Sequence, residues 1–272
     1  MAGARSAAGD PETNPVLSAR AAALLARIDR DLPTLARELI PQSPSVSARF
    51  LERPDDPGEH KPEWHQYGII THTRQFVVAL RDAVPGALRR IDPAIAARAE
   101  AYFATPLDDL TRWELLLVAG YWHDVGKFTT RTIGRRGDWR FIGHAHDSAR
   151  LIAAGPDGGL GARYGLTATQ TAFVARLADL HYAPMELKLA LDRGGGVPMG
   201  RDVYGEIAAT LGTAGYAVCA LFWADCLSKG DTPRQRTQRP ELWNLLVRTL
   251  HAVDAAARPK SQMTTEEMIA PG

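Results

Sequence analysis

Apolar residues recur at steps of three and four along most of the chain, which is the spacing of one buried helix face. The pattern is continuous from Val16 to Ile40, where Pro33 is expected to divide it into two helices. A second apolar face lies between His65 and Val84 and includes His72. Further helices are predicted around 93–103, from Thr111 to the end of an apolar run at 122, from His144, and over 167–180, 216–227 and 241–255.

The stretches between these helices carry breaker residues. Pro41–Trp64 is proline-rich and predicts an extended lead-in, and Pro85-Gly86 is expected to end the preceding helix. The basic segment 128–140 and the glycine-rich segments 155–165 and 194–200 are expected to be loops. Because no segment shows the two-residue period of a strand, the predicted class is all-α.

The most informative stretch is the apolar run that ends at His123-Asp124-Val125-Gly126-Lys127. Thr111 is a plausible N-cap for its helix, and Glu114 three residues later completes a capping box. The helix would therefore deliver an imidazole and a carboxylate together at its C-terminal end. These two groups suit a hard or borderline divalent cation.

Other potential ligands also lie within or at the end of predicted helices. Asp225 interrupts an apolar turn, where an aspartate is costly unless it is paired or bound to a metal. Metal sites in helical bundles are built from side chains that project inward from different helices. A second pair, His146-Asp147, is interpreted as supporting or incidental. The predicted ligands are His72, His123, Asp124, His144, His181 and Asp225.

Composition narrows the class of protein. The 272 residues are 45% hydrophobic and 23% charged, with a net charge of +1, so nothing global demands a nucleic acid or a membrane surface. Cys219 and Cys226 lie seven residues apart on one predicted helix, which favours a reducing compartment over a disulfide framework. No apolar run reaches the length of a membrane span, and the N-terminus lacks an apolar signal core. We therefore expect a cytoplasmic protein without a membrane segment.

The order of these residues resembles that of the HD-domain metal-dependent phosphohydrolases, whose signature is His, His-Asp and Asp. Trp64-His65 and His72-Thr73 are similar to the entry of the HD domain in bacterial tRNA nucleotidyltransferases, the CCA-adding enzymes. His123–Lys127 followed by Thr130-Arg131-Thr132, and Phe141-x-Gly143-His144 followed by Ser148-Ala149, resemble two further segments of that domain. The resemblance covers about residues 60–232. It implies an HD-domain helical bundle with extra N- and C-terminal helices.

The domain boundaries follow from the same pattern. Residues 1–15 and 257–272 are expected to be disordered tails, and residues 16–256 a single helical domain. The nucleotidyltransferase head would need a glycine turn and two catalytic carboxylates on a strand, which the residues before His65 lack. CCA addition is therefore not expected.

The resemblance implies hydrolysis of a phosphoester by a metal-activated water. One or two divalent ions (Mn, Ni, Mg, Zn or Fe) are expected, with Asp124 as the bridging and catalytic carboxylate. Lys127 and Arg131 are expected to neutralise phosphate charge. The substrate would be a phosphorylated small molecule, such as a nucleotide, or an RNA end. The arginines at 135, 136, 140, 234, 236 and 239, together with Lys229, are interpreted mainly as solvated charges that could line the mouth of the site.

Two other functions fit the same residues. HD-type di-iron oxygenases use six ligands in this order, and iron content with an oxygen requirement would identify one. A non-catalytic HD module that binds RNA or a protein partner is the third possibility. Such a module would be expected to have lost a ligand, and no ligand is missing here.

Overall fold

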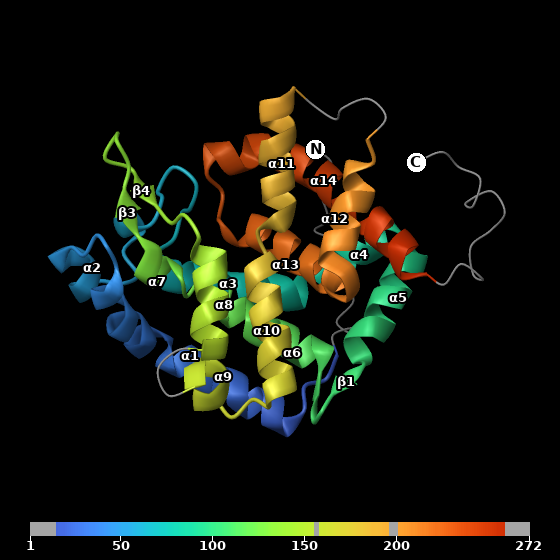
Figure 1. Ribbon diagram of the computed structural model, residues 1–272, viewed down its shortest axis with the longest axis horizontal. Helices are drawn as coiled ribbons and strands as arrows, with labels where there is room; N and C mark the ends of the chain where they lie inside the picture. The colour runs from blue at the N-terminus through green and yellow to red at the C-terminus, as the bar shows by residue number, and fades with distance from the viewer. Residues whose placement is uncertain (1–14, 155–157, 196–200, 259–272) are drawn as a thin grey trace, which may run out of the picture.

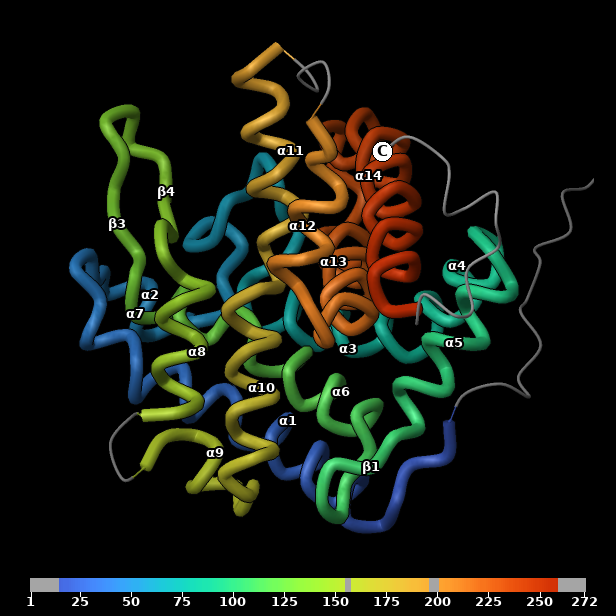
Figure 2. The backbone as a smooth tube through the Cα atoms, turned by 45° about the vertical axis from the view of Figure 1, so that its right-hand side comes forward, coloured from blue at the N-terminus to red at the C-terminus, as the bar shows by residue number. Residues whose placement is uncertain are grey.

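The structure is a computed structural model that describes residues 15–154, 158–195 and 201–258. Helices make up 74% of it and strands 3%, so the predicted all-α class is confirmed. Figures 1 and 2 show a bundle of helices, from which α11 (Ala183–Gly194) and the hairpin of β3 (Thr132–Ile133) and β4 (Trp139–Arg140) project in the same direction. The tails expected at 1–15 and 257–272 lie almost wholly outside the described residues. The α-helices are α1 Ala19–Leu39, α2 Ala48–Glu52, α3 Ile69–Asp82, α4 Val84–Ile91, α5 Pro93–Ala104, α6 Arg112–Trp122, α7 Lys127–Thr130, α8 His144–Ala154, α9 Gly159–Arg163, α10 Ala168–Leu180, α11 Ala183–Gly194, α12 Val203–Leu211, α13 Gly215–Ser228 and α14 Pro233–Ala257.

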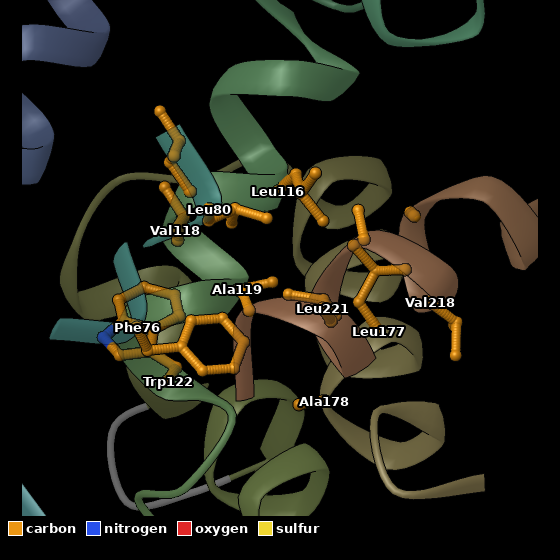
Figure 3. Close-up of a cluster of buried hydrophobic side chains, with 14 of the residues drawn as sticks. Phe76, Leu80, Leu116, Val118, Ala119, Trp122, Leu177, Ala178, Val218 and Leu221 are labelled. Carbon is orange, nitrogen blue, oxygen red and sulfur yellow. The ribbon is translucent and has the colours of Figure 1, made fainter. Parts of the chain in front are cut away.

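The core forms where α3, α6, α10 and α13 meet. Figure 3 shows Phe76 of α3, Trp122 of α6 and Leu221 of α13 within this group. Each of these side chains is at most 2% exposed to solvent. Burial of a large apolar side chain contributes about 1.5–3 kcal/mol, so this group fixes the four helices against one another. The labelled side chains are Phe76, Leu80, Leu116, Val118, Ala119, Trp122, Leu177, Ala178, Val218 and Leu221.

Helix α1 continues through Pro33, so the expected division into two helices is wrong. A proline inside a helix leaves the carbonyl four residues earlier without its N–H donor. That carbonyl belongs to Asp29, and the Arg74 side chain on α3 donates to it at 3.2 Å and to the Asp29 carboxylate at 2.8 Å. The arginine therefore replaces the missing bond and ties α1 to α3.

The helix before Pro85-Gly86 ends as expected, because α3 stops at Asp82 with Ala83 as its C-cap. Pro85 and Gly86 themselves lie in the first turn of the next helix, α4, where a proline is tolerated because its missing N–H would be unpaired anyway. Other proline-rich and glycine-rich stretches contain more helix than predicted. The proline-rich lead-in contains α2 and the 3₁₀ turns Ile40–Gln42 and Pro57–Glu59. The predicted loop at 155–165 contains α9, and 155–157 lie outside the described residues. Helices α11 and α12 flank the second glycine-rich segment, of which 196–200 are likewise not described.

Two short hairpins complete the described chain. Strands β1 (Pro106–Leu107) and β2 (Leu110–Thr111) pair just before α6. Strands β3 (Thr132–Ile133) and β4 (Trp139–Arg140) pair within the segment predicted as a basic loop. Each strand has only two residues, which is too short to show a periodic sequence signal.

The segment Val203–Ser228 is long and apolar enough to cross a membrane by length and composition alone. Its apolar window is 78% buried inside the protein, and the segment contains both α12 and α13. Core helices of soluble proteins pass the same test, so its apolar character is accounted for by packing against α3 and α14.

Candidate metal centre

Asp124 lies at the centre of a group of buried histidines. The capping box of Thr111 and Glu114 starts α6 as predicted, and the helix ends at Trp122 with His123 as its C-cap. Asp124 follows in the turn before α7, and its side chain is 2% exposed. Its Oδ2 lies 3.2 Å from Nε2 of His123.

The two oxygens of Asp124 face different histidines. Oδ2 lies 3.3 Å from Nε2 of His72, on the same side as His123. Oδ1 lies 3.3 Å from Nε2 of His144 and 3.8 Å from Nε2 of His181. A carboxylate placed in this way can bridge two ions, each of which would have its own pair of histidines.

Asp225 extends the side that contains His72. It lies in α13, and its Oδ1 is 3.3 Å from Nε2 of His72. Two sets of three ligand atoms, from His72, His123 and Asp225 and from His123, Asp124 and His181, each lie within 4.8 Å of one another. The structure thus brings together all six residues that the sequence suggested as ligands.

The core helices position most of these ligands. His72 comes from α3, His123 and Asp124 from the end of α6, His181 from the C-cap of α10, and Asp225 from α13. These are the four helices that meet in the apolar core. His144 begins α8, which packs along α10. Movement of one helix within the core would therefore also move a ligand.

A backbone carbonyl lies at Nδ1 of each ligand histidine. The Nδ1–O distances are 2.8 Å from His123 to Gly120, 2.8 Å from His144 to Phe141 and 2.6 Å from His181 to Ala178. For His72 the acceptor is the carbonyl of Ser228, at 3.4 Å. Since a carbonyl can only accept, Nδ1 carries a proton, which leaves Nε2 as the ring atom that can bind a cation. Metal-binding histidines are oriented by contacts of this kind.

The donor atoms lack partners that the protein itself could supply. Nε2 of His72, Nε2 of His123 and Oδ1 of Asp124 are buried without a hydrogen-bond partner among the described residues. Such an atom costs about 1–3 kcal/mol. Ligands about 2.1 Å from an ion lie roughly 3–3.5 Å apart when adjacent and about 4.2 Å apart when opposite. The observed separations of 3.2–3.8 Å match, so the residues fit a divalent ion.

Both carboxylates are ionised in this environment. Burial alone would raise the pKa of Asp124, but the neighbouring His123 and Lys127 hold it well below its usual range. Burial has the same effect on Asp225, where the ammonium of Lys229, 2.6 Å away, and the contact with His72 outweigh it. Each aspartate therefore offers a negatively charged oxygen to a cation.

The histidines fall into two electrostatic groups. Burial lowers the pKa of His144 to about 4 and that of His181 to about 3, so both are neutral at pH 7. Burial also acts against a charged His72, but the carboxylates of Asp124 and Asp225 outweigh it and raise its pKa. The proton that they favour on Nε2 of His72 occupies the position that a cation would take.

Lys127 and Arg131, the two cations expected to bind phosphate, lie in different surroundings. The ammonium of Lys127 is 2.7 Å from Oδ2 of Asp124, at the edge of the cluster. The Arg131 side chain is fully buried, forms an ion pair with Glu59, and lies against the rings of Phe50 and Trp139. It also donates to the Ser45 carbonyl at 3.1 Å. Arg131 thus anchors the lead-in segment, and its guanidinium does not face the cluster.

Three further residues at the site were not predicted as members of it. His60 and His65 are buried with their ring centroids 3.9 Å apart, and the His65 ring lies 4.7 Å from that of His72. Lys229 is buried against Asp225, whereas the sequence placed it on a solvated rim. Its spacing of four residues from Asp225 was a usable signal, since such residues share a helix face. His60 gave no comparable signal, because its contact with Lys127 spans 67 residues.

The second His-Asp pair and the hairpin arginines do not join the ligands. The His146 side chain is 85% exposed, 3.5 Å from Asp179, and does not join the ligands. Asp147 is the partner of Thr129 and Arg150. The hairpin arginines Arg135, Arg136 and Arg140 are exposed, as expected for solvated charges.

No protein-family model matches this chain, and no curated protein matches it.

Proposed function

We propose that this chain is a divalent-metal-dependent phosphohydrolase of the HD superfamily. The observation that carries the proposal is the convergence of four histidine Nε2 atoms on the two oxygens of Asp124, with Asp225 beside His72. The motif order that resembles the HD phosphohydrolases supports the same function. The substrate class is a phosphoester of a nucleotide or an RNA end, hydrolysed as a phosphodiester or a phosphomonoester.

The donor set divides naturally into two sites. His72, His123 and Asp225 would hold one ion, and His144 and His181 a second, with Asp124 between them. Mixed imidazole and carboxylate ligands suit Mn, Ni, Mg, Zn or Fe. When bound, a divalent ion lowers the pKa of a coordinated water to about 7 and polarises a phosphoryl oxygen.

The residues around the ligands orient the reactants. Lys127 lies between Oδ2 of Asp124 and Nε2 of His60, at 2.7 and 3.1 Å, and this pair of contacts fixes its ammonium beside the cluster. A fixed ammonium binds a phosphoryl oxygen without first losing side-chain freedom. Because Arg131 is committed to Glu59, we assign phosphate neutralisation to Lys127 and not to Arg131.

The two cysteines bear on the cellular location. Cys219 and Cys226 are free, buried thiols, as expected in a reducing compartment. Burial raises the pKa of each to about 12, so neither supplies a thiolate to the site. We propose a cytoplasmic location on this basis.

The six-ligand set keeps one competing function open. A di-iron oxygenase would use the same residues, with Asp124 in the same bridging position. The identity of the bound metal distinguishes the oxygenase from the hydrolase. Two equivalents of iron and oxygen uptake would support the oxygenase, whereas hydrolysis with a redox-inert ion such as Mg or Zn would support the hydrolase.

The test combines elemental analysis with a phosphoester screen on the full chain. Wild type and an Asp124→Asn variant are reconstituted with each candidate metal. We expect one or two equivalents in the wild type, loss of at least one in the variant, and hydrolysis in the wild type alone. A matched pair on α8 controls for histidine loss. His144→Ala should lower metal content, and His146→Ala should not, because His146 points into solvent. A protein that binds no metal after reconstitution would support the non-catalytic binding module.

A further inference from the structure

Two lysines border the ligand cluster, and each is paired with one of its carboxylates. Nζ of Lys127 lies 2.7 Å from Oδ2 of Asp124, and Nζ of Lys229 lies 2.6 Å from Oδ2 of Asp225. Their side chains are 8% and 10% exposed. Both aspartates also contact Nε2 of His72 at 3.3 Å, so the two ammonium groups belong to one continuous site.

The ammonium groups have more donors than the protein uses. Each ammonium carries three N–H donors. Lys127 donates to Asp124 and to Nε2 of His60, because His60 directs its other ring nitrogen at the Tyr67 carbonyl, 3.1 Å away. Lys229 has Asp225 as its acceptor within the described part of the chain. One donor of Lys127 and two of Lys229 are thus left for a ligand.

The charges of the site point to the same ligand. The two ammonium groups cancel the two carboxylates, and the four imidazoles, with Nδ1 directed at carbonyls, bind a metal as neutral ligands. One divalent ion therefore adds two positive charges that the contacting groups do not balance, and two ions add four. An unbalanced charge in a buried site is costly. A doubly charged ligand supplies more of this missing negative charge than a singly charged one.

A phosphate monoester matches these requirements better than a diester. A monoester dianion presents three terminal oxygens and two negative charges, whereas a diester presents two oxygens and one charge. We propose, on the basis of the phosphohydrolase function above, that the site selects phosphomonoester dianions and that Lys229 is the residue that determines this selectivity. Lys127 is already held by two acceptors, so Lys229 supplies most of the free donors.

A lysine–aspartate pair away from the cluster has different surroundings. Lys188 and Asp192 on α11 also lie four residues apart, with a separation of 2.7 Å. There the Asp192 side chain is 56% exposed, and Lys188 has a second acceptor in Glu241 at 3.3 Å. The Lys229–Asp225 pair is buried at a metal-ligand carboxylate instead. Lys188 is therefore a matched control for the loss of a paired lysine.

The experiment measures ligand binding to the metal-loaded full chain by calorimetry at pH 8. The probes are inorganic phosphate, which is a dianion at this pH, and dimethyl phosphate, which is a monoanion. We expect wild type to prefer inorganic phosphate by at least about tenfold, the effect of one charge-assisted hydrogen bond. Lys229→Met should weaken phosphate binding by about tenfold to a hundredfold and change dimethyl phosphate binding much less. Lys229→Arg should retain the preference, and Lys188→Met should behave as wild type.

Two binding results would overturn the inference. One is equal affinity of the wild type for the two probes, a comparison that needs no variant. The other is an equal loss of both probes in Lys229→Met at unchanged metal content. Rates with p-nitrophenyl phosphate and bis(p-nitrophenyl) phosphate separate this inference from the proposed function. Faster cleavage of the diester would refute the selectivity and leave the hydrolase intact. Dianion binding that depends on Lys229, without hydrolysis of either compound, would support the selectivity and count against the hydrolase.

Discussion

Gly126 gives the sharpest test of how the residues of the candidate metal centre are held in place. It follows Asp124 by two residues, in the turn between α6 and α7, and its backbone packs directly on α8. A Cβ atom built at this position overlaps the carbonyl oxygen of His144 and lies 2.7 Å from the amide nitrogen of Ser148. Both are backbone atoms, so no side-chain rotation can relieve the clash. A Gly126→Ala substitution must therefore separate α8 from the turn that contains Asp124.

The expected loss of stability can be built from the contacts that would change. Overpacking against a rigid neighbour costs about 1–3 kcal/mol. The separation also stretches two hydrogen bonds of Ser148, from the Gly126 amide at 2.9 Å and to the His123 carbonyl at 2.8 Å. Each is worth about 1 kcal/mol. We expect Gly126→Ala to lower the free energy of unfolding by roughly 2–5 kcal/mol.

The site should respond as well. His144 begins α8 and lies 3.3 Å from Oδ1 of Asp124, so a shift of a few tenths of an ångström disturbs the second group of ligands. Urea denaturation gives the stability, and elemental analysis gives the metal content. Gly86→Ala is the control, because a Cβ there meets nothing within 4 Å in the first turn of α4. If Gly126→Ala matches the Gly86→Ala control in both stability and metal content, the close packing of α8 against Gly126 is refuted.

Two further predictions concern charge. Metal-free protein should lose stability as the pH falls from about 6.5 towards 3, by an amount on the order of a few kcal/mol. Burial lowers the pKa of His144 to about 4 and that of His181 to about 3 in the folded protein. The unfolded chain therefore takes up protons at these histidines at a higher pH, and their protonation favours unfolding. A urea midpoint that stays constant from pH 7 to 4 would count against this. Arg131→Met should destabilise the fold by up to about 3–5 kcal/mol, because it leaves the buried Glu59 with only the more distant Arg49, at 3.9 Å, as a cation partner among the described residues. Metal content should not change, and adding Glu59→Leu should restore part of the stability. Full stability with lost activity would instead indicate a direct role of Arg131 in phosphate binding.

Local sequence signals predicted which helix ends carry two of the candidate ligands. Thr111 and Glu114 form the predicted capping box, which places the end of α6 at His123. Thr167 caps α10 in the same way and places His181 at its end. These signals act over three or four residues, and the apolar faces act within one helix, so both can be recognised in a single sequence.

Features set by distant contacts were harder to predict. Pro33 by itself predicts a break. The helix continues because Arg74, 41 positions later, donates to the Asp29 carbonyl that the proline leaves without an N–H donor. Arg131 looked like a phosphate ligand because its partner Glu59 lies 72 residues away. The hydrophobic pattern shows that a segment is helical but does not show which polar side chains meet across helices. The neighbours of a cation thus decide its role, and the three-dimensional structure reveals them.

The direction of the helices has its own consequence for the candidate site. His123 and His181 are the C-caps of α6 and α10, and Asp225 lies in the last turn of α13. The peptide dipoles of a helix add up to about half a negative charge at its C-terminal end. Three such ends therefore meet at the cluster and make it attractive to cations even before the aspartates contribute. The same field repels an approaching anion, and the ammonium groups of Lys127 and Lys229 stand where they would offset that repulsion.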